Sequence, residues 1–298
     1  MDLAWKMLER VPPSLKASVK RCTSTELRLW LRDRLGVSDR SIPDKIVTVK
    51  DGRRFHIGPD YIYLPLFVSG EFEPAATTVV KRLLRKGDHV VDAGANYGWY
   101  TTLCAEIVGS KGSVYAFEPV PSTFDRLNEH ITLNSNSDCV VAEQLALGIE
   151  QGETYVHLFN DLSHSRSSIS NLGRNHFVVH CVPMTDLKSY LESRRVDHID
   201  FLKCDVEGSE LMVLQGAGEI LDRVNAPIIL IELNEETAPE FGYQPIDIVN
   251  YLRDRGYDSF YGIEAKNTIC RIKDPQKVAK LNPLLCCKGD RIEKRMGS

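Results

Sequence analysis

The segment from His89 to Gly98 constrains the fold more than any other part of the chain. It opens on short β-branched valines, as a strand covered on both faces requires, and continues into a turn marked by Gly94 and Gly98. A helix is predicted from Trp99 to Gly109, where glycine is a suitable C-cap. Such a turn directs free backbone N–H groups and the positive end of a helix dipole at an anionic group. The segment therefore predicts a cofactor-binding loop.

The loop differs from the dinucleotide fingerprint G-x-G-x-x-G at its middle glycine. Asn96 stands there, and its side chain would crowd a pyrophosphate although it suits a smaller carboxylate. Asp92, at the end of the strand, is a hydrogen-bond acceptor that matches an ammonium or a hydroxyl better than a phosphate. An α-amino acid carries both a carboxylate and an ammonium, so S-adenosylmethionine fits this loop better than NAD does.

The next predicted strand, Ser113 to Phe117, also ends in an acid, Glu118. Its distance along the chain from Asp92 is that at which a Rossmann-type crossover places a carboxylate on the ribose hydroxyls. A third strand is predicted from Val140 to Leu147. Gln144 and Ala146 near its end are candidates to flank the adenine, although both also suit an ordinary strand.

Four sequence blocks in order resemble the FkbM-type methyltransferases, a branch of the class I S-adenosylmethionine-dependent enzymes. The blocks are Gly70–Pro74, Val91–Gly98, Phe117–Pro119 and Phe201–Glu210, and the resemblance covers about residues 65 to 235. The last block, with its Lys-x-Asp-x-Glu-Gly-x-Glu pattern, is the most specific. The resemblance implies S-adenosylmethionine as cofactor and O-methylation of sugar or natural-product hydroxyls. It also implies a cofactor site formed by the following residues: Glu73, Asp92, Gly94, Asn96, Tyr97, Gly98, Glu118, Pro119, Gln144, Ala146 and Asp205.

Strands that alternate with helices predict an α/β fold with a doubly wound, mostly parallel sheet. Further strands are expected at residues 199–204 and 228–232, and an antiparallel pair at 154–159 and 176–182. The spacing Ser122-x-x-Asp125 predicts a capping box for the helix that follows Glu118. We expect an N-terminal extension over residues 1–64, with a helix within 14–35 and a hairpin at 46–57, and a methyltransferase domain over 65–298.

Acids at the carboxyl ends of the strands are the candidate catalytic groups, because ligands of doubly wound sheets bind there. Asp205 is expected to face the reactive end of the cofactor, and Glu232 is a candidate base, metal ligand or hydrogen-bond anchor. Glu207 is expected in the opening turn of the next helix, where acids also suit the dipole. Lys203 lies two residues before Asp205, and an ion pair with a carboxylate is as plausible as a catalytic role. A divalent metal bound by these acids is a further possibility.

The composition of the chain narrows the cellular compartment and the binding partners that we expect. The chain has 298 residues and a net charge of −4, with positive termini and an acidic middle, which argues against a nucleic-acid channel. It contains no apolar run long enough to span a membrane and opens without the order of a signal peptide, so we expect a cytoplasmic protein. The eight cysteines include no C-x-x-C, and Cys104, Cys139, Cys181 and Cys204 are expected to be buried. The N-terminal helix is a candidate dimer contact.

Together with the residues of the loop, the family resemblance implies an O-methyltransferase that acts on a hydroxyl of a small polar molecule, a sugar or a glycosylated or natural-product metabolite. The polar segment 160–174, which includes His164 and Arg166, is expected to recognise the acceptor because loops so placed carry specificity. Two alternatives stay open on the residues alone. One is an NAD-dependent oxidoreductase, which Asn96 disfavours, and the other is a non-catalytic cofactor-binding or scaffold protein.

Overall fold

The computed structural model describes residues 44–58, 63, 66, 69–159, 167–168, 177–264 and 268–297. The predicted N-terminal helix at 14–35, and the acceptor segment 160–174 apart from Ser167 and Ser168, lie outside the described residues. No helix in the described part of the chain is long and apolar enough to cross a membrane.

The central sheet has eight strands in the order β13-β12-β14-β11-β10-β3-β4-β5. Its parallel half consists of β3 (His89–Ala93), β4 (Ser113–Phe117), β5 (Val140–Glu143), β10 (Phe201–Cys204) and β11 (Ile228–Ile231). The antiparallel half adds β12 (Ser259–Ile263), β13 (Ile269–Arg271) and β14 (Leu284–Cys287). The α/β, doubly wound fold class is confirmed. The C-terminal strands were not predicted from the sequence.

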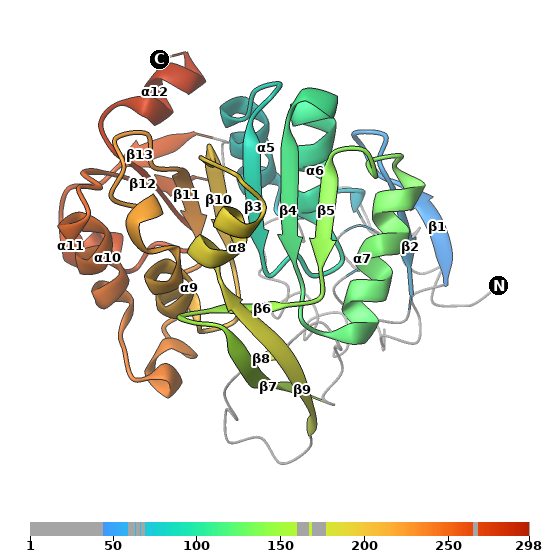
Figure 1. Cartoon of the computed structure of the whole chain (residues 1–298). Coiled ribbons are helices and arrows are strands. Elements are labelled where there is room, and N and C mark those ends of the chain that lie inside the picture. The colour runs from blue at the N-terminus through green and yellow to red at the C-terminus, as the bar shows by residue number, and fades with distance from the viewer. Residues whose placement is uncertain are drawn as a thin grey trace, which may run out of the picture.

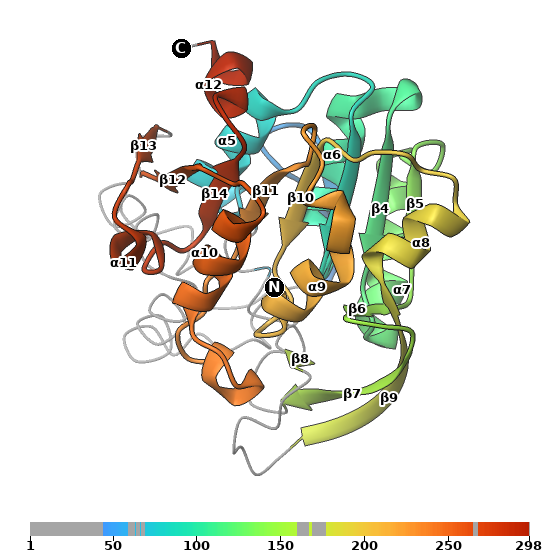
Figure 2. The same ribbon diagram turned by 60° about the vertical axis from the view of Figure 1, so that its left-hand side comes forward.

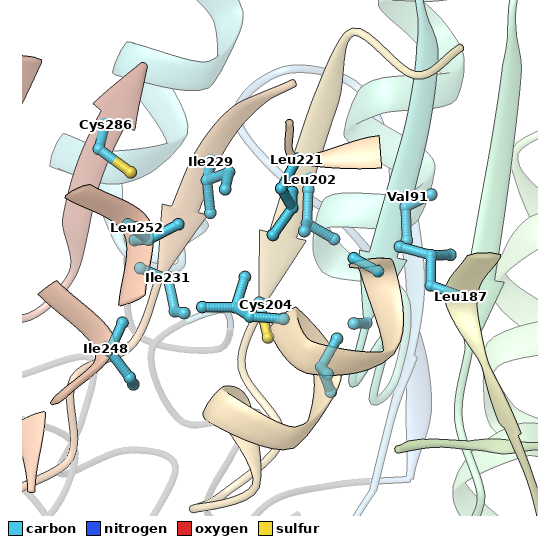
Figure 3. Close-up of a cluster of buried hydrophobic side chains, with 14 of the residues drawn as sticks. Val91, Leu187, Leu202, Cys204, Leu221, Ile229, Ile231, Ile248, Leu252 and Cys286 are labelled. Atoms are coloured by element: carbon cyan, nitrogen blue, oxygen red, sulfur yellow. The ribbon is translucent and has the colours of Figure 1, made fainter. Parts of the chain in front are cut away.

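Helices cover both faces of this sheet (Figures 1 and 2). One face carries α5 (Pro74–Leu83), α6 (Trp99–Val108), α7 (Pro121–Leu133) and α12 (Arg291–Met296). The other face carries α8 (Leu187–Ser193), α9 (Glu210–Ala217), α10 (Pro245–Asp254) and α11 (Pro275–Val278). Successive side chains on each strand point to opposite faces of the sheet. Val90 and Phe201 pack in the core with α5 and α6, while Val91 and Leu202 pack in the core on the other face (Figure 3).

A second, four-stranded sheet projects below the carboxyl ends of β3, β4 and β5 in Figure 1. It consists of β6 (Ala146–Gly148), β7 (Gly152–Phe159), β8 (Ser167–Ser168) and β9 (Phe177–Asp186), so the predicted antiparallel pair is confirmed as β7 and β9. The single strand predicted from Val140 to Leu147 is wrong. The chain leaves the central sheet after Glu143, and Ala146 then pairs with Met184 of β9. Because only two residues separate β5 from β6 in the chain, the apolar residues of both made two short strands look like one.

Two other local predictions are also wrong. The helix α7 begins at Pro121, with Val120 as its N-cap and no side-chain cap, so Ser122 lies inside the helix and forms no capping box. Proline sets the start because its fixed φ suits the first helical position and it has no N–H to satisfy. Cys181 is exposed, unlike Cys104, Cys139 and Cys204, because it lies on the outer face of β9.

The predicted hairpin is present as β1 (Lys45–Thr48) and β2 (Arg54–Ile57). Phe55 and Ile57 belong to the same core cluster as α5 and α6. Arg53 is buried beside them: it donates to the Trp99 carbonyl and the Thr102 hydroxyl, and its guanidinium lies 4.1 Å from the Trp99 ring centre. The hairpin therefore fixes the start of α6. The proposed division between residues 64 and 65 stays a prediction.

Candidate active site

The turn after β3 has the backbone conformation that its glycines predict. Gly94, Asn96 and Gly98 all have positive φ, at 75°, 51° and 84°. A β-carbon on Gly94 would lie 1.9 Å from the carbonyl oxygen of Asp205, and one on Gly98 would lie 2.6 Å from Leu127. The turn is thus wedged between the end of β10 and helix α7, and glycine is needed at both positions because of contact as well as conformation.

Glu118 holds this turn from the next strand. One carboxylate oxygen accepts from the backbone N–H of Asn96 at 2.9 Å, and the other accepts from that of Val120 at 3.0 Å. The residue is 5% exposed, and burial raises the pKa of Glu118 to about 7 against those two hydrogen bonds. Each oxygen keeps a further lone pair for a ligand hydroxyl.

A cavity of about 600 Å³, partly open to solvent, lies beside Glu118. Seven of the predicted site residues line it: Gly94, Asn96, Glu118, Pro119, Ala146, Asp205 and Glu207. Leu145, Leu147 and Val156 add apolar walls that the sequence did not single out, because nothing showed that the chain turns at Glu143 into a second sheet. Gln144 is exposed and is not among the lining residues, whereas its neighbour Leu145 is. We call this space the cofactor cavity.

Asp92 lies below the cavity rather than in its wall. It is fully buried, and its Oδ2 accepts from the Thr101 hydroxyl at 2.6 Å. The ammonium near it belongs to the protein: Lys203, its register neighbour on β10, has Nζ 3.8 Å from Asp92 Oδ1 and 3.1 Å from Asp205 Oδ2. The same Nζ donates to the Gly94 carbonyl at 3.2 Å. Lys203 therefore links the two acids and the cofactor loop.

These ion pairs set the charges of the cluster. Burial alone would lower the pKa of Lys203, but the carboxylates of Asp205, Asp92 and Glu73 raise it above the ordinary value. Burial alone would raise the pKa of Asp205, but Lys203 and a hydrogen bond with Glu232 hold it below the ordinary value. Lys203 is thus a fixed cation that orients Asp205, and it has no proton to exchange near neutral pH.

Glu232 and Asp205 share one proton. The negative charge of Asp205, followed by burial, raises the pKa of Glu232, and Glu232 also accepts from the Asn282 amide at 3.1 Å. Two carboxyl groups in hydrogen-bond contact do not both ionise, and the pair titrates as a unit. At neutral pH the proton therefore lies on Glu232 and the charge on Asp205.

The loop between β10 and α9 is held in place by Glu210. Glu210 is buried in the first turn of α9, where its Oε1 accepts from the backbone N–H groups of Val206 and Gly208 and its Oε2 accepts from the Tyr243 hydroxyl. Glu207 and Gly208 precede the helix with φ of 56° and 118°. Glu207 was expected inside the opening turn; it lies instead on the bent loop, and its carboxylate is near enough to Glu232 to raise that pKa.

A second cavity, of about 490 Å³, lies on the other side of Asp205. Six aromatic residues line it: Phe55, Tyr63, Phe72, Tyr97, Trp99 and Tyr100. Of these, Tyr97 was predicted as a cofactor residue, and Tyr97 and Trp99 stood out in the sequence as rings for stacking. The others come from the hairpin, the segment after it and α6, and no sequence pattern had placed them together. We call this space the aromatic cavity.

Glu73 is connected to the aromatic cavity by a hydrogen bond with Tyr100, which lines that cavity. The residue as a whole is exposed, but its carboxylate accepts from the Tyr100 hydroxyl at 2.6 Å. Desolvation of that carboxylate and the nearby charge of Asp205 raise the pKa of Glu73. Its backbone has a left-handed φ of 42° just before Pro74, which opens α5.

The two cavities share Asn96 and Asp205. A donor in one and an acceptor in the other would thus meet at a single carboxylate. Among the described residues, no group of three or more His, Cys, Asp or Glu side chains is arranged to hold a metal ion, so the predicted acid cluster gains no support as a metal site.

The fold and the site have the features of a class I S-adenosylmethionine-dependent methyltransferase: the parallel strand order, the bent glycine loop and a strand-end acid beside it. The family model of the methyltransferase FkbM domain matches residues 92–259, and the chain belongs to that family. Family membership favours methyl transfer over the NAD-dependent oxidoreductase that the sequence left open.

The chain is similar to named methyltransferases and, more distantly, to a solved structure. The hexuronic acid methyltransferase AglP of Haloferax volcanii is 29% identical over 183 residues, which cover 59% of this chain and 67% of that protein. The methyltransferase sdnD of Sordaria araneosa is 27% identical over 197 residues, which cover 57% of this chain and 73% of that protein. An S-adenosylmethionine-dependent O-methyltransferase structure from Thermotoga maritima is 12% identical, covers 83% of this chain and 79% of its own, and aligns with a TM-score of 0.39.

Proposed function

We propose that this protein transfers a methyl group from S-adenosylmethionine to a hydroxyl of a small polar molecule, with a sugar or a glycosylated metabolite as the leading class. The observation that carries the proposal is the position of Asp205, which lines both the cofactor cavity and the aromatic cavity. A carboxylate at that junction can touch an acceptor hydroxyl in one cavity while a methyl donor occupies the other.

The residues around the cofactor cavity suit S-adenosylmethionine. Glu118 offers acceptor lone pairs for ribose hydroxyls, and Leu145, Ala146 and Val156 offer apolar surface for the adenine. The bent loop at Gly94 and Asn96 lies where the amino-acid end would reach. Asp92 takes a different part from the one first predicted: its carboxylate faces Lys203 and Thr101, so we assign it to holding the loop.

When bound, S-adenosylmethionine supplies an electrophilic methyl carbon on a positively charged sulfur. The protein then has to align a hydroxyl with that carbon and remove the hydroxyl proton as the new O–C bond forms and the S–C bond breaks. Asp205 is the proposed base because it is ionised at neutral pH and is held by Lys203. Glu232, which carries the shared proton, orients Asp205 by donating to it.

The relatives support the choice of acceptor class. The name of AglP gives a hexuronic acid as its acceptor, which is a sugar derivative. This chain is similar to AglP over 59% of its length, and we extend the sugar assignment to it as part of the proposal. The choice of oxygen over nitrogen rests on Asp205, since a hydroxyl needs a base to take its proton as it attacks and a neutral amine does not.

The test combines binding with product analysis. Calorimetry with S-adenosylhomocysteine and NAD in parallel should show micromolar binding of the former and none of the latter. Incubation with S-adenosylmethionine carrying a labelled methyl group, and with paired hydroxyl and amine acceptors, should label the hydroxyl members. Label on amines alone, or preferential binding of NAD, would overturn the proposal.

A further inference from the structure

The aromatic cavity has the lining of a site for a flat, uncharged group. Its six aromatic rings come from three stretches of the chain, and Leu66 adds a further apolar wall. The Tyr63 and Tyr97 ring centres are 4.8 Å apart and tilted by 36°, and Phe72 meets Trp99 edge-on at 6.0 Å. Rings held against one another in this way form a rigid apolar surface on which a ligand ring can stack.

The charged groups of the cavity are few. Within the described lining they are Lys203 and Asp205, and beside them lie Asn96 and the Tyr100 hydroxyl, which donates to Glu73. Lys203 is the only cation of that described lining, and it is already paired with Asp205 and lies 3.8 Å from Asp92. Two carboxyl groups therefore flank one ammonium before Glu73 is counted, so the single cation of the described lining is already paired.

Arg53, a second cation near the aromatic cavity, is also paired with a carboxylate. Arg53 lies beside the Trp99 ring, but its side chain is fully buried and its guanidinium is held by both carboxylate oxygens of Asp51. Burial opposes the ionisation of Asp51, yet its bonds with Arg53 and Lys81 lower its pKa to about 2, so the charge of Asp51 persists at any physiological pH. Arg53 is thus neutralised behind the wall of the cavity.

We propose that the aromatic cavity binds an uncharged ring of the acceptor, and that the Asp205 carboxylate, with the neighbouring Lys203 already paired to it, selects against acceptors with a carboxylate on that ring. The inference rests on the proposed function and narrows its acceptor class. A ring stacked on the surface that Tyr63, Tyr97 and Trp99 form would direct a hydroxyl toward Asp205. A carboxylate at the same place loses water and meets Asp205, with Asp92 behind it, while finding no free cation in the described lining. A neutral pyranoside and a phenol satisfy these demands by the same chemistry.

The experiment uses matched pairs of acceptors with the full chain loaded with S-adenosylhomocysteine. One pair is 4-nitrophenyl glucopyranoside and 4-nitrophenyl glucuronide, and the other is 4-hydroxybenzyl alcohol and 4-hydroxybenzoate. Binding is read by saturation-transfer NMR with competition. The uncharged member of at least one pair should bind ten or more times more tightly than its acid. A preference for the acids, equal binding, or binding of none of the four compounds would overturn the proposal, and the pair that binds identifies the kind of ring.

Substitutions of residues that line the aromatic cavity test the proposal further. Phe72→Ala should weaken the uncharged ligand about tenfold and leave S-adenosylhomocysteine affinity unchanged, whereas Tyr155→Ala, an exposed aromatic on β7 outside the cavity, should change neither. Phe72→Arg should shift the preference toward the acids. If S-adenosylhomocysteine binds normally while these shifts are absent, the acceptor assignment alone fails. If the cofactor does not bind at all, the methyltransferase proposal fails with it.

Discussion

The backbone of Gly94 lies so close to the carbonyl oxygen of Asp205 that an added β-carbon would come within 1.9 Å of it. The cofactor loop and the proposed base therefore have a single relative position. Lys203 reinforces this from below by binding the Gly94 carbonyl and the Asp205 carboxylate together. Any change that moves one of them moves the other.

Gly94→Ala should therefore cost more than its backbone conformation alone. A left-handed residue with a β-carbon costs roughly 1–2 kcal/mol, and the contact with Asp205 adds to that. Gly52→Ala is the matched control, because Gly52 also has a positive φ, 93°, but an added β-carbon meets nothing within 4 Å. Thermal unfolding and calorimetry with S-adenosylhomocysteine should show cofactor binding lost only in the Gly94 variant. Equal effects in both variants would mean that the contact is unimportant.

Glu118→Ala should weaken S-adenosylhomocysteine binding. A hydrogen bond to a charged group is worth roughly 1.5–3 kcal/mol, which is about ten- to a hundredfold in affinity. Glu143 ends the neighbouring strand β5 and bonds to Tyr190 and Arg194 outside the cavity, so Glu143→Ala is the control and should leave the affinity unchanged. Calorimetry of the two variants decides the point, and unchanged affinity in the Glu118 variant would remove the ribose assignment.

Asp205→Asn should lower turnover by about 10²–10⁴ while cofactor affinity changes little, as loss of a general base does. Glu232→Gln should keep most of the activity near neutral pH, because the side chain there is already protonated and the amide can still donate to Asp205. The lowered pKa of Asp205 means that activity is present at neutral pH and is lost only as the pH falls below the ordinary aspartate value of 3.8. Steady-state rates across pH test this. The reverse ranking of the variants would make Glu232 the base.

Lys203→Met should destabilise the protein by about 3–5 kcal/mol, because it leaves the buried carboxylate of Asp92 without its cation. Adding Asp92→Asn removes the stranded charge, so the double variant should be more stable than the sum of the single effects by about 1–3 kcal/mol. Urea unfolding of the four proteins of this cycle measures the coupling. Strict additivity would show that the pair contributes nothing.

His130 should make stability depend on pH in one direction. Its Nδ1 lies within hydrogen-bond distance of the Tyr97 carbonyl, and its Nε2 lies 3.0 Å from the His56 backbone nitrogen and 3.2 Å from the His56 carbonyl oxygen. Burial outweighs these contacts and lowers the pKa of His130 below 6.5. The unfolded chain then binds a proton that the folded chain resists. Stability is lost as the pH falls below about 6.5, by up to about 1.4 kcal/mol for each pH unit.

His130→Asn isolates this effect from the other groups that titrate nearby. The raised pKa of Glu118 acts in the opposite sense, since its contribution is present at low pH and is lost as the pH rises through about 7. The comparison is therefore between variants: the wild type should lose more stability than His130→Asn on going from pH 7.5 to 5.5. The exposed His198 offers the control, and His198→Asn should follow the wild type. Parallel curves for all three proteins would rule out His130.

The sequence predicted the parts of the site that depend on local pattern. Gly94, Gly98 and Glu118 follow from a strand, a turn and a second strand-end acid, and each has the expected place. It failed where long-range packing decides. Nothing local distinguishes Asp92, which faces Lys203, from an acid that faces a ligand. The rings of Phe55 and Phe72 meet Trp99, and Arg53 bonds to the Trp99 carbonyl, through contacts between residues far apart in the chain.

The linings of the two cavities differ in how much of each lies within the family stretch. Every residue that lines the cofactor cavity lies within the stretch that the FkbM family model matches, residues 92–259, whereas Phe55, Tyr63, Leu66 and Phe72 of the aromatic cavity precede it. On the proposed assignment, the donor site lies wholly within the family stretch, whereas one wall of the acceptor site comes from the chain ahead of it. Substitutions at Phe55, Tyr63, Leu66 or Phe72 would then reshape the acceptor site without touching any residue that lines the cofactor cavity.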